Sequence, residues 1–226
     1  MEFWYNFAKG IVRPYLTFLV QGFDVKGKEN IEPGPKIIVA NHPNATDAFF
    51  LPFIFPEKLH FFIQEETFGI IIIGRLLKFA DQIPVVAGRG REALGEACEK
   101  LSQGQSVVIF PEGHLSHGKA LRRAGSGAAM LALKSGAPVV PVGFYVPPEF
   151  TRTIRLSNND RDIVGRWQMR GRCSIQIGEP WKLDLVSYRD QSYRSLRELT
   201  EGIMLKIQNL VQLAENSVKA SAATKI

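Results

Sequence analysis

Short apolar runs that end at glycine, proline or asparagine restrict the fold of this chain more than any other feature. Lys36–Ala40 and Ser106–Phe110 are rich in β-branched side chains, which is typical of buried strands. Further strands are predicted at Leu59–Gln64, Ile83–Val86, Ala137–Val142 and Arg172–Ile177. Helical patterns lie between these runs. The alternation predicts an α/β domain with a mixed, largely parallel central sheet flanked by helices.

Apolar periodicity and glycine stops predict the helical segments. Thr67–Phe79 is a strongly apolar helix or helix pair, interrupted at Gly69 and Gly74. The other predicted helices are Arg89–Gln103, which ends at Gly104, Gly125–Ser135, which ends at Gly136, and Ser192–Leu213. A chain of 226 residues is long enough for one domain with a sizeable core. We place this domain at residues 25–216 and a flexible tail at 217–226.

A basic stretch, Thr151–Arg172, contains several arginines and is predicted to be an exposed insertion or long loop. A run of charges is most often a solvated face, and that is the preferred interpretation here. Contact with a phospholipid surface or with an acidic partner protein is the alternative.

Residues 1–24 are predicted to form an amphipathic helical segment ahead of the domain. Charged residues interrupt its apolar side chains, so no uncharged run of about 18 residues exists and a membrane-spanning helix is disfavoured. On a helical wheel, Trp4, Phe7, Ile11, Tyr15 and Phe18 share one face, and Asn6, Lys9, Arg13 and Thr17 share the other. This pattern favours a helix in the membrane interface, kinked or split at Pro14. Packing on the domain's own core is the alternative.

His42 and Asp47 are the candidate catalytic pair. Their spacing of five is not a same-face helical spacing, so the pair requires His42 before a helix and Asp47 in its first turns. The strand Lys36–Ala40 comes directly before, and Pro43 suits a first helical position. His42 would then stand at the carboxyl end of a strand, where open α/β sheets bind ligands. A helix-capping loop without catalytic function is the alternative for such a pair taken alone.

A second candidate site follows the strand Ser106–Phe110. Pro111, Glu112 and Gly113 form a turn, and a basic stretch that includes Ser116, Arg122 and Arg123 comes next. A carboxylate at a strand end followed by basic residues favours an anion-binding wall, whereas a solvated surface turn is the alternative. Arg89 and Arg91 follow the strand Ile83–Val86 and are further candidates for holding an anion.

Taken in order, these blocks resemble those of the glycerolipid acyltransferase family, whose type member acylates lysophosphatidic acid. The Asn-His-x4-Asp motif of that family is matched by Asn41, His42 and Asp47, and its Phe-Pro-Glu-Gly motif by Phe110–Gly113 with Ser116. A proline-flanked strand is matched by Pro138–Val142, and a strand that ends near an arginine is matched loosely by Ile83–Arg91. The resemblance covers roughly residues 30 to 145. It implies that Asn41, Arg89, Arg91, Glu112, Gly113, Ser116, Arg122 and Arg123 bind substrate.

One departure from the family leaves the acceptor open. The chain has His114-Leu115 where the family usually has Thr-Arg after Glu-Gly. That arginine is associated with the phosphate of the acceptor, so a different, non-phosphate lipid acceptor stays an alternative. Arg89, Arg91, Arg122 or Arg123 are the candidates to supply the missing charge.

The chemistry implied by the resemblance suits the residues. His42 would take the proton of an acceptor hydroxyl as it attacks an acyl thioester, and Asp47 would orient the imidazole. Backbone N–H groups near His42 or Gly113 are candidate oxyanion donors. A hydrolase and a non-catalytic lipid-binding module are the competing classes, but no Gly-x-Ser-x-Gly elbow is present for the first.

The charge and cysteine content agree with an intracellular, lipid-facing protein. The net charge of +6 suits an anionic partner, and no zinc-finger or RNA-binding motif points to nucleic acid. Cys98 and Cys173 lie far apart, and Cys98 falls in a predicted helix as a small core residue. We expect no metal and no cofactor, with acyl-CoA or acyl carrier protein as co-substrate. The expected location is peripheral or monotopic, on the cytoplasmic face of a membrane.

Overall fold

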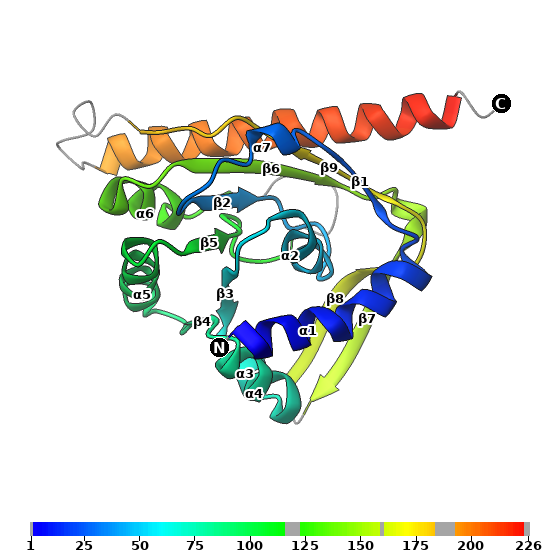
Figure 1. The fold of residues 1–226 in the computed structure, drawn as a ribbon, viewed down its shortest axis with the longest axis horizontal. Helices are drawn as coiled ribbons and strands as arrows, with labels where there is room; N and C mark the ends of the chain where they lie inside the picture. Colours follow the sequence, from blue (N-terminus) through cyan, green and yellow to red (C-terminus); the bar gives the residue numbers. More distant parts are fainter. Residues whose placement is uncertain (1, 116–122, 159–160, 184–192, 224–226) are drawn as a thin grey trace.

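A seven-stranded sheet forms the centre of the computed structural model, which describes residues 2–115, 123–158, 161–183 and 193–223 (Figure 1). The strand order is β1-β9-β6-β2-β5-β3-β4. The strands are β1 (Phe23–Lys26), β2 (Ile37–Ala40), β3 (Leu59–Gln64), β4 (Ile83–Val85), β5 (Ser106–Ile109), β6 (Val139–Tyr145) and β9 (Cys173–Ile177). The α/β prediction and the strand predictions are therefore confirmed.

The sheet is parallel from β6 to β4 and reverses at its other edge. β2 pairs in parallel with both β5 and β6, while β9 runs antiparallel to β6 and β1 runs parallel to β9. No strand was predicted at Phe23–Lys26, because its alternating exposed side chains give a weak apolar signal. The predicted boundary between residues 24 and 25 consequently falls inside β1.

Helices cover both faces, and strand alternation assigns the core side chains to one face or the other. Ile37 packs with α5 (Gly90–Ser102), α6 (Gly127–Ser135) and α7 (Tyr193–Ala223). The next residue, Ile38, packs with α2 (Leu51–Ile54) and with the π-helical turn η1 (Tyr15–Leu19). Cys98 lies on α5 against the first of these clusters, as predicted.

α7 lies so close to β6 that only a glycine fits at the contact. A Cβ atom added to Gly143 would lie 2.5 Å from the backbone of Leu210 and Val211. We expect Gly143→Ala to lower the free energy of unfolding by about 1–3 kcal/mol, because the helix must shift. Gly95, exposed on α5 with open space around it, is the matched control. Gly95→Ala should instead raise stability by about 0.5–1 kcal/mol in denaturant unfolding. Equal effects of the two changes would contradict the close approach.

The basic stretch after β6 is a hairpin and not the predicted loop. β7 (Thr151–Asn158) pairs antiparallel with β8 (Arg161–Gln168) in a separate two-stranded sheet. The short helix η4 (Pro148–Phe150) leads into it. The β-branched and apolar residues of Thr-Arg-Thr-Ile-Arg-Leu alternate with arginines, which is typical of a strand. The many charged residues of the stretch favoured a loop instead.

The apolar segment after β3 is a helix pair, α3 (Glu65–Phe68) and α4 (Ile71–Phe79), with a break at Gly69. Gly74 does not interrupt it, because this glycine lies inside α4, where an added Cβ would lie 1.9 Å from the Phe68 carbonyl oxygen. α7 continues to Ala223, so the helix extends beyond the predicted start of a tail at residue 217. The remaining short helices are η2 (Lys28–Asn30) and η3 (Asp47–Phe49).

The N-terminal segment is helical, as predicted, and it divides at Pro14. α1 (Glu2–Pro14) gives way there to the π-helical turn η1. Tyr5 and Leu16 are buried, and the Tyr5 hydroxyl accepts the N–H of Leu59 at 3.2 Å. One side of the segment therefore packs on the domain. Among the described residues, no helix combines the length and the apolar character needed to cross a bilayer.

Candidate active site

His42 lies just beyond the carboxyl end of β2, the place that the sequence predicts. The side chain of Asn41 fixes this point: its Nδ2 donates to the Phe144 carbonyl at 2.9 Å, and its Oδ1 accepts the Phe144 N–H at 2.7 Å. β2 is thereby tied to β6 at the start of residues 41–49, which carry the candidate pair and which we call the candidate catalytic loop. Contact between Asn41 and substrate stays a prediction.

His42 and Asp47 face each other, with His42 Nδ1 3.4 Å from Asp47 Oδ2. This distance is long for a hydrogen bond, and such contacts often tighten only when substrate is bound. The His42 side chain is 19% exposed and that of Asp47 is 0% exposed. Nδ1 therefore faces the buried carboxylate, which leaves Nε2 as the nitrogen available to a substrate.

Asp47 stands at the start of η3, so the requirement for a helix start at this residue is met. Pro43 is not the first helical residue, however, because residues 43–46 form a bend and turn. The Asn44 N–H donates to Asp47 Oδ2 at 2.6 Å. Burial raises the pKa of the Asp47 carboxyl, whereas His42 and Asn44 act in the opposite direction. The Asp47 carboxylate is thus shielded from solvent and contacts both His42 and the Asn44 N–H.

The turn after β5 supports the histidine from the other side. The His42 and Phe110 rings stack with centroids 4.0 Å apart and planes at 13°. Glu112 is buried and its Oε1 accepts the backbone N–H of His42 at 3.0 Å. Gly113 has φ +69°, in the left-handed region that favours glycine. The structure therefore brings the two predicted blocks together, and Glu112 fixes the His42 backbone.

The backbone donors that we predicted for the oxyanion are already in use. The His42 N–H donates to Glu112, and the Gly113 N–H donates to the Phe110 carbonyl at 3.0 Å. In the same loop, the Asn44 N–H bonds Asp47 and the Ala45 N–H bonds the Arg166 carbonyl at 2.7 Å. None of these four groups is free to stabilise an oxyanion in this structure.

Two of the predicted anion-binding arginines, Arg89 and Arg91, lie away from His42. Arg89 and Arg91 are exposed after β4, three strands along the sheet from β2, or about 14 Å at the usual strand spacing. Arg89 pairs with Glu92 at 2.8 Å. Ser116 and Arg122 lie outside the described residues. Substrate binding by all four stays a prediction.

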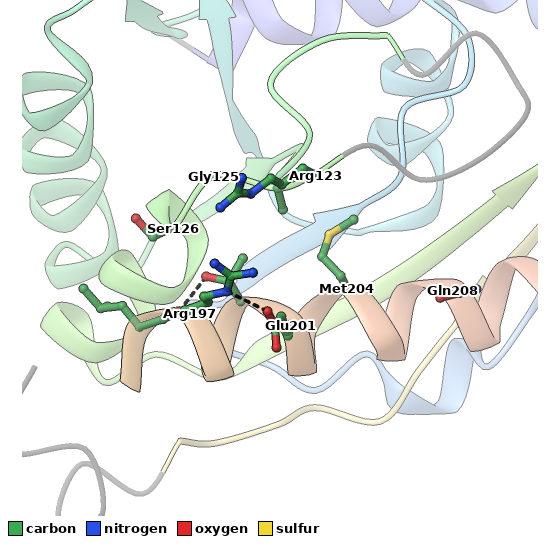
Figure 2. Close-up of a pocket in the computed structure, with 10 residues that line it drawn as sticks. Arg123, Gly125, Ser126, Arg197, Glu201, Met204 and Gln208 are labelled. Atoms are coloured by element: carbon green, nitrogen blue, oxygen red, sulfur yellow. Dashed lines mark hydrogen bonds and ion pairs between the residues drawn. The ribbon is translucent and has the colours of Figure 1, made fainter. Parts of the chain in front are cut away.

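Arg123 lines a pocket of about 580 Å³ between the segment before α6 and the side of α7 (Figure 2). Arg197, Glu201 and Met204 line it from α7. The Gly125 N–H in the same wall donates to the Pro111 carbonyl at 3.0 Å, so the pocket adjoins the turn that carries Glu112. His42 is not among the lining residues.

The β7–β8 hairpin contacts the candidate catalytic loop, a role that the sequence did not reveal. Besides the Arg166 carbonyl, which holds Ala45, the Gln168 N–H donates to Thr46 Oγ1 at 3.4 Å. The Trp167 ring meets Phe49 edge to face at 6.2 Å. These partners are remote in the chain, so no local pattern could have identified them.

Comparisons with known proteins agree on one family. The family model described as Acyltransferase matches residues 22–145. The chain is 30% identical over 136 residues to a 1-acyl-sn-glycerol-3-phosphate acyltransferase of Pseudomonas aeruginosa, which covers 57% of this chain and 52% of that protein. It is also 30% identical over 169 residues to a lyso-ornithine lipid O-acyltransferase of the same organism, covering 70% of this chain and 64% of the relative.

The fold has a solved counterpart. The crystal structure of a 1-acyl-sn-glycerophosphate acyltransferase from Thermotoga maritima superposes with a TM-score of 0.66 at 24% identity, over 94% of this chain and 78% of that one. The chain spans about half the length of the first curated relatives it matches. Because the family model covers more than half of the chain and includes both blocks of the site, the chain belongs to the acyltransferase family.

Proposed function

We propose that this protein is an O-acyltransferase that moves a fatty acyl group from an acyl thioester, carried by coenzyme A or acyl carrier protein, to the hydroxyl of a lysophospholipid. The preferred acceptor is 1-acylglycerol-3-phosphate, which would give phosphatidic acid. The single observation that carries the proposal is the buried Asp47 facing His42, fixed by Glu112, inside the segment that matches the family.

The reaction needs one base and no covalent enzyme intermediate. His42 Nε2 removes the acceptor's hydroxyl proton as the oxygen attacks the thioester carbonyl and the new C–O bond forms. Asp47 stabilises the imidazolium through Nδ1–H. The tetrahedral intermediate collapses, the C–S bond breaks, and the thiolate takes the proton back from the imidazolium. His42 is then neutral and ready for the next turnover.

A second acceptor class is favoured by one specific residue. Leu115 occupies the position where the family usually has an arginine. The lyso-ornithine lipid O-acyltransferase matches more of this chain than the 1-acyl-sn-glycerol-3-phosphate acyltransferase of the same organism. A lyso-ornithine lipid, whose head group is an amino acid in place of a phosphate, is therefore the second candidate acceptor.

One assay separates the candidates. The purified protein is incubated with labelled acyl-CoA or acyl carrier protein, alone, with lysophosphatidic acid, or with lyso-ornithine lipid. Label in phosphatidic acid supports the first acceptor, and label in ornithine lipid supports the second. Release of free fatty acid without any acceptor would indicate a hydrolase. Binding of lipid without transfer or release, with either donor, would overturn the enzymatic proposal.

A group of exposed apolar side chains on α1, η1 and α4, which we call the apolar surface, supports binding of this protein to a membrane. Trp4 stacks on Phe79 with centroids 4.9 Å apart and joins α1 to α4. The apolar surface consists of Phe3, Trp4, Phe7, Ile11, Phe18, Leu19, Ile71, Ile72, Ile73 and Phe79. Arg13, Arg75 and Lys78 are exposed on the same helices. Apolar side chains beside cations suit the interface of an anionic bilayer.

We expect Phe7→Glu and Ile72→Glu each to weaken binding to vesicles that contain anionic lipid. The side chain of Ile72 is 81% exposed, so the change removes apolar contact with lipid without disturbing the core. Leu205→Glu, at a 58% exposed position on α7, is the matched control, since α7 lies on the opposite side of the molecule (Figure 1). Vesicle co-sedimentation measures the effect. Binding reduced equally by all three changes would contradict the assignment of the apolar surface.

A further inference from the structure

The N-terminal segment reaches the candidate catalytic loop through a partly buried tyrosine, Tyr15. We propose that Tyr15 is a positioning residue: with Gln168 and Thr46 it holds the loop that carries Asp47 in place against His42. The activity that it would affect is the proposed acyl transfer, so the inference rests on the proposed function.

Tyr15 is the first residue of the π-helical turn η1. A π-helical turn inserts an extra residue into the helical repeat and re-aims the side chains near it. The Tyr15 hydroxyl donates to the Gln168 carbonyl at 2.5 Å, and the ring meets Phe49 of η3 edge to face at 6.0 Å. Tyr15 therefore contacts the hairpin with its polar end and the candidate catalytic loop with its ring.

Gln168 is a rigid link between Tyr15 and the loop. It is fully buried, and its side-chain Nε2 donates to the carbonyls of Arg170 and Gly171 at 3.3 and 2.9 Å. Its carbonyl accepts the Tyr15 hydroxyl while its N–H donates to Thr46 Oγ1. A shift of Tyr15 would thus be passed through one anchored residue to the side chain that immediately precedes Asp47.

Charge links Tyr15 to the site as well. Burial raises the pKa of Tyr15 to about 12, with the Thr46 hydroxyl lowering it and the Asp47 charge raising it. Tyr15 therefore stays a neutral donor at physiological pH. Among the described residues, two other titratable groups interact with His42 and Asp47. Glu112 accepts the His42 N–H. Burial and the Asp47 charge raise the pKa of the Cys173 thiol on β9.

Tyr5 provides a matched control on the same N-terminal segment. Tyr5 is buried, burial raises its pKa to about 12, and its hydroxyl also forms a hydrogen bond with the domain backbone. Its partner is the N–H of Leu59 at the start of β3, at the end of the sheet away from His42. Both tyrosines help to dock the segment, but only Tyr15 contacts the candidate catalytic loop.

The test compares Tyr15→Phe with Tyr5→Phe in the full chain, using the acyl transfer assay. Loss of one hydrogen bond that positions Asp47 should lower kcat by about 3–10-fold in Tyr15→Phe, with little change in KM. The acid limb of the pH profile should move to lower pH, because the imidazolium loses part of its counter-charge. Tyr5→Phe should match the wild type in both respects.

A double variant asks whether Tyr15 acts through Asp47. In the Asp47→Asn background, Tyr15→Phe should have no further effect on the residual kcat, since residues that act as a unit are not additive. Equal losses in Tyr15→Phe and Tyr5→Phe, or full additivity with Asp47→Asn, would overturn the inference. Absence of transfer by the wild type would instead refute the proposed function.

Discussion

Replacing His42 by alanine is expected to lower kcat by at least about 10²–10⁴-fold, the usual contribution of a positioned general base. The His42 side chain is partly exposed at a strand end, so its removal leaves the core intact. The hydrogen bond to Glu112 comes from the backbone N–H of residue 42, which alanine retains. The midpoint of thermal unfolding should therefore change by only a few degrees. Acyl transfer and thermal unfolding, measured on the same preparations, check both parts.

A second change at His42 separates proton transfer from packing. Glutamine at this position is planar and can still lie on Phe110 and bond Asp47, but it cannot accept a proton from the acceptor. His42→Gln should consequently be as inactive as His42→Ala. Turnover in the glutamine variant near that of the wild type would show that the stacked ring serves packing and would refute the mechanism.

Asp47→Asn should lower kcat by about 10²–10⁴-fold while leaving stability unchanged or raised. The amide can keep the contact with the Asn44 N–H, but it no longer stabilises the imidazolium or selects its tautomer. Burial raises the pKa of Asp47 in the folded state, so the ionised carboxylate is destabilising at neutral pH. The protonated carboxyl favours the folded state, and this stabilisation is fully present below the unfolded pKa of about 3.9. It is lost as the pH rises through the raised pKa of the folded state, because the buried carboxyl must then ionise.

Thermal unfolding between pH 4 and pH 8 tests this sign. The wild type should lose stability relative to Asp47→Asn as the pH rises across this range, since only the wild type must ionise a buried carboxyl. A variant that is less stable than the wild type at pH 8 would mean that the contacts of the carboxylate with His42 and Asn44 outweigh the cost of burial. Loss of activity together with loss of the fold would leave no evidence for an orienting role.

The sequence predicted the sheet well because its strands are buried on both faces and so form continuous apolar runs, as at Ile37–Ala40 and Ser106–Ile109. β1 was missed for the opposite reason, since it is an edge strand with alternate side chains exposed. His42 and Asp47 could be paired because they lie on one loop. The sequence did not predict the hydrogen bond between the His42 N–H and Glu112, which was expected to bind substrate; it forms because the carboxyl ends of the parallel strands β2 and β5 lie at the same edge of the sheet.

The rest of the site depends on contacts between distant parts of the chain. Tyr15 and Gln168 are 153 positions apart, and neither belongs to a motif. The sequence placed Tyr15 on the apolar face of an amphipathic helix. Its ring does make an apolar contact, with Phe49, but this placement does not reveal that its hydroxyl bonds Gln168. The use of loop N–H groups by Glu112 and by the Arg166 carbonyl was likewise invisible to local spacing.

The pairing of β1 with β9 has a consequence for how the protein is made. Phe23 is hydrogen-bonded in register with Cys173, so the first strand of the sheet has no neighbour until the last has been synthesised. At about 5–20 residues per second, a ribosome needs roughly 8–30 s to cover that interval. During this time α1 and η1 have been synthesised, but Gln168, which accepts the hydrogen bond of Tyr15 in η1, has not. The helix α1, whose exposed apolar side chains we propose to bind a bilayer, is therefore synthesised before the hairpin that holds the candidate catalytic loop.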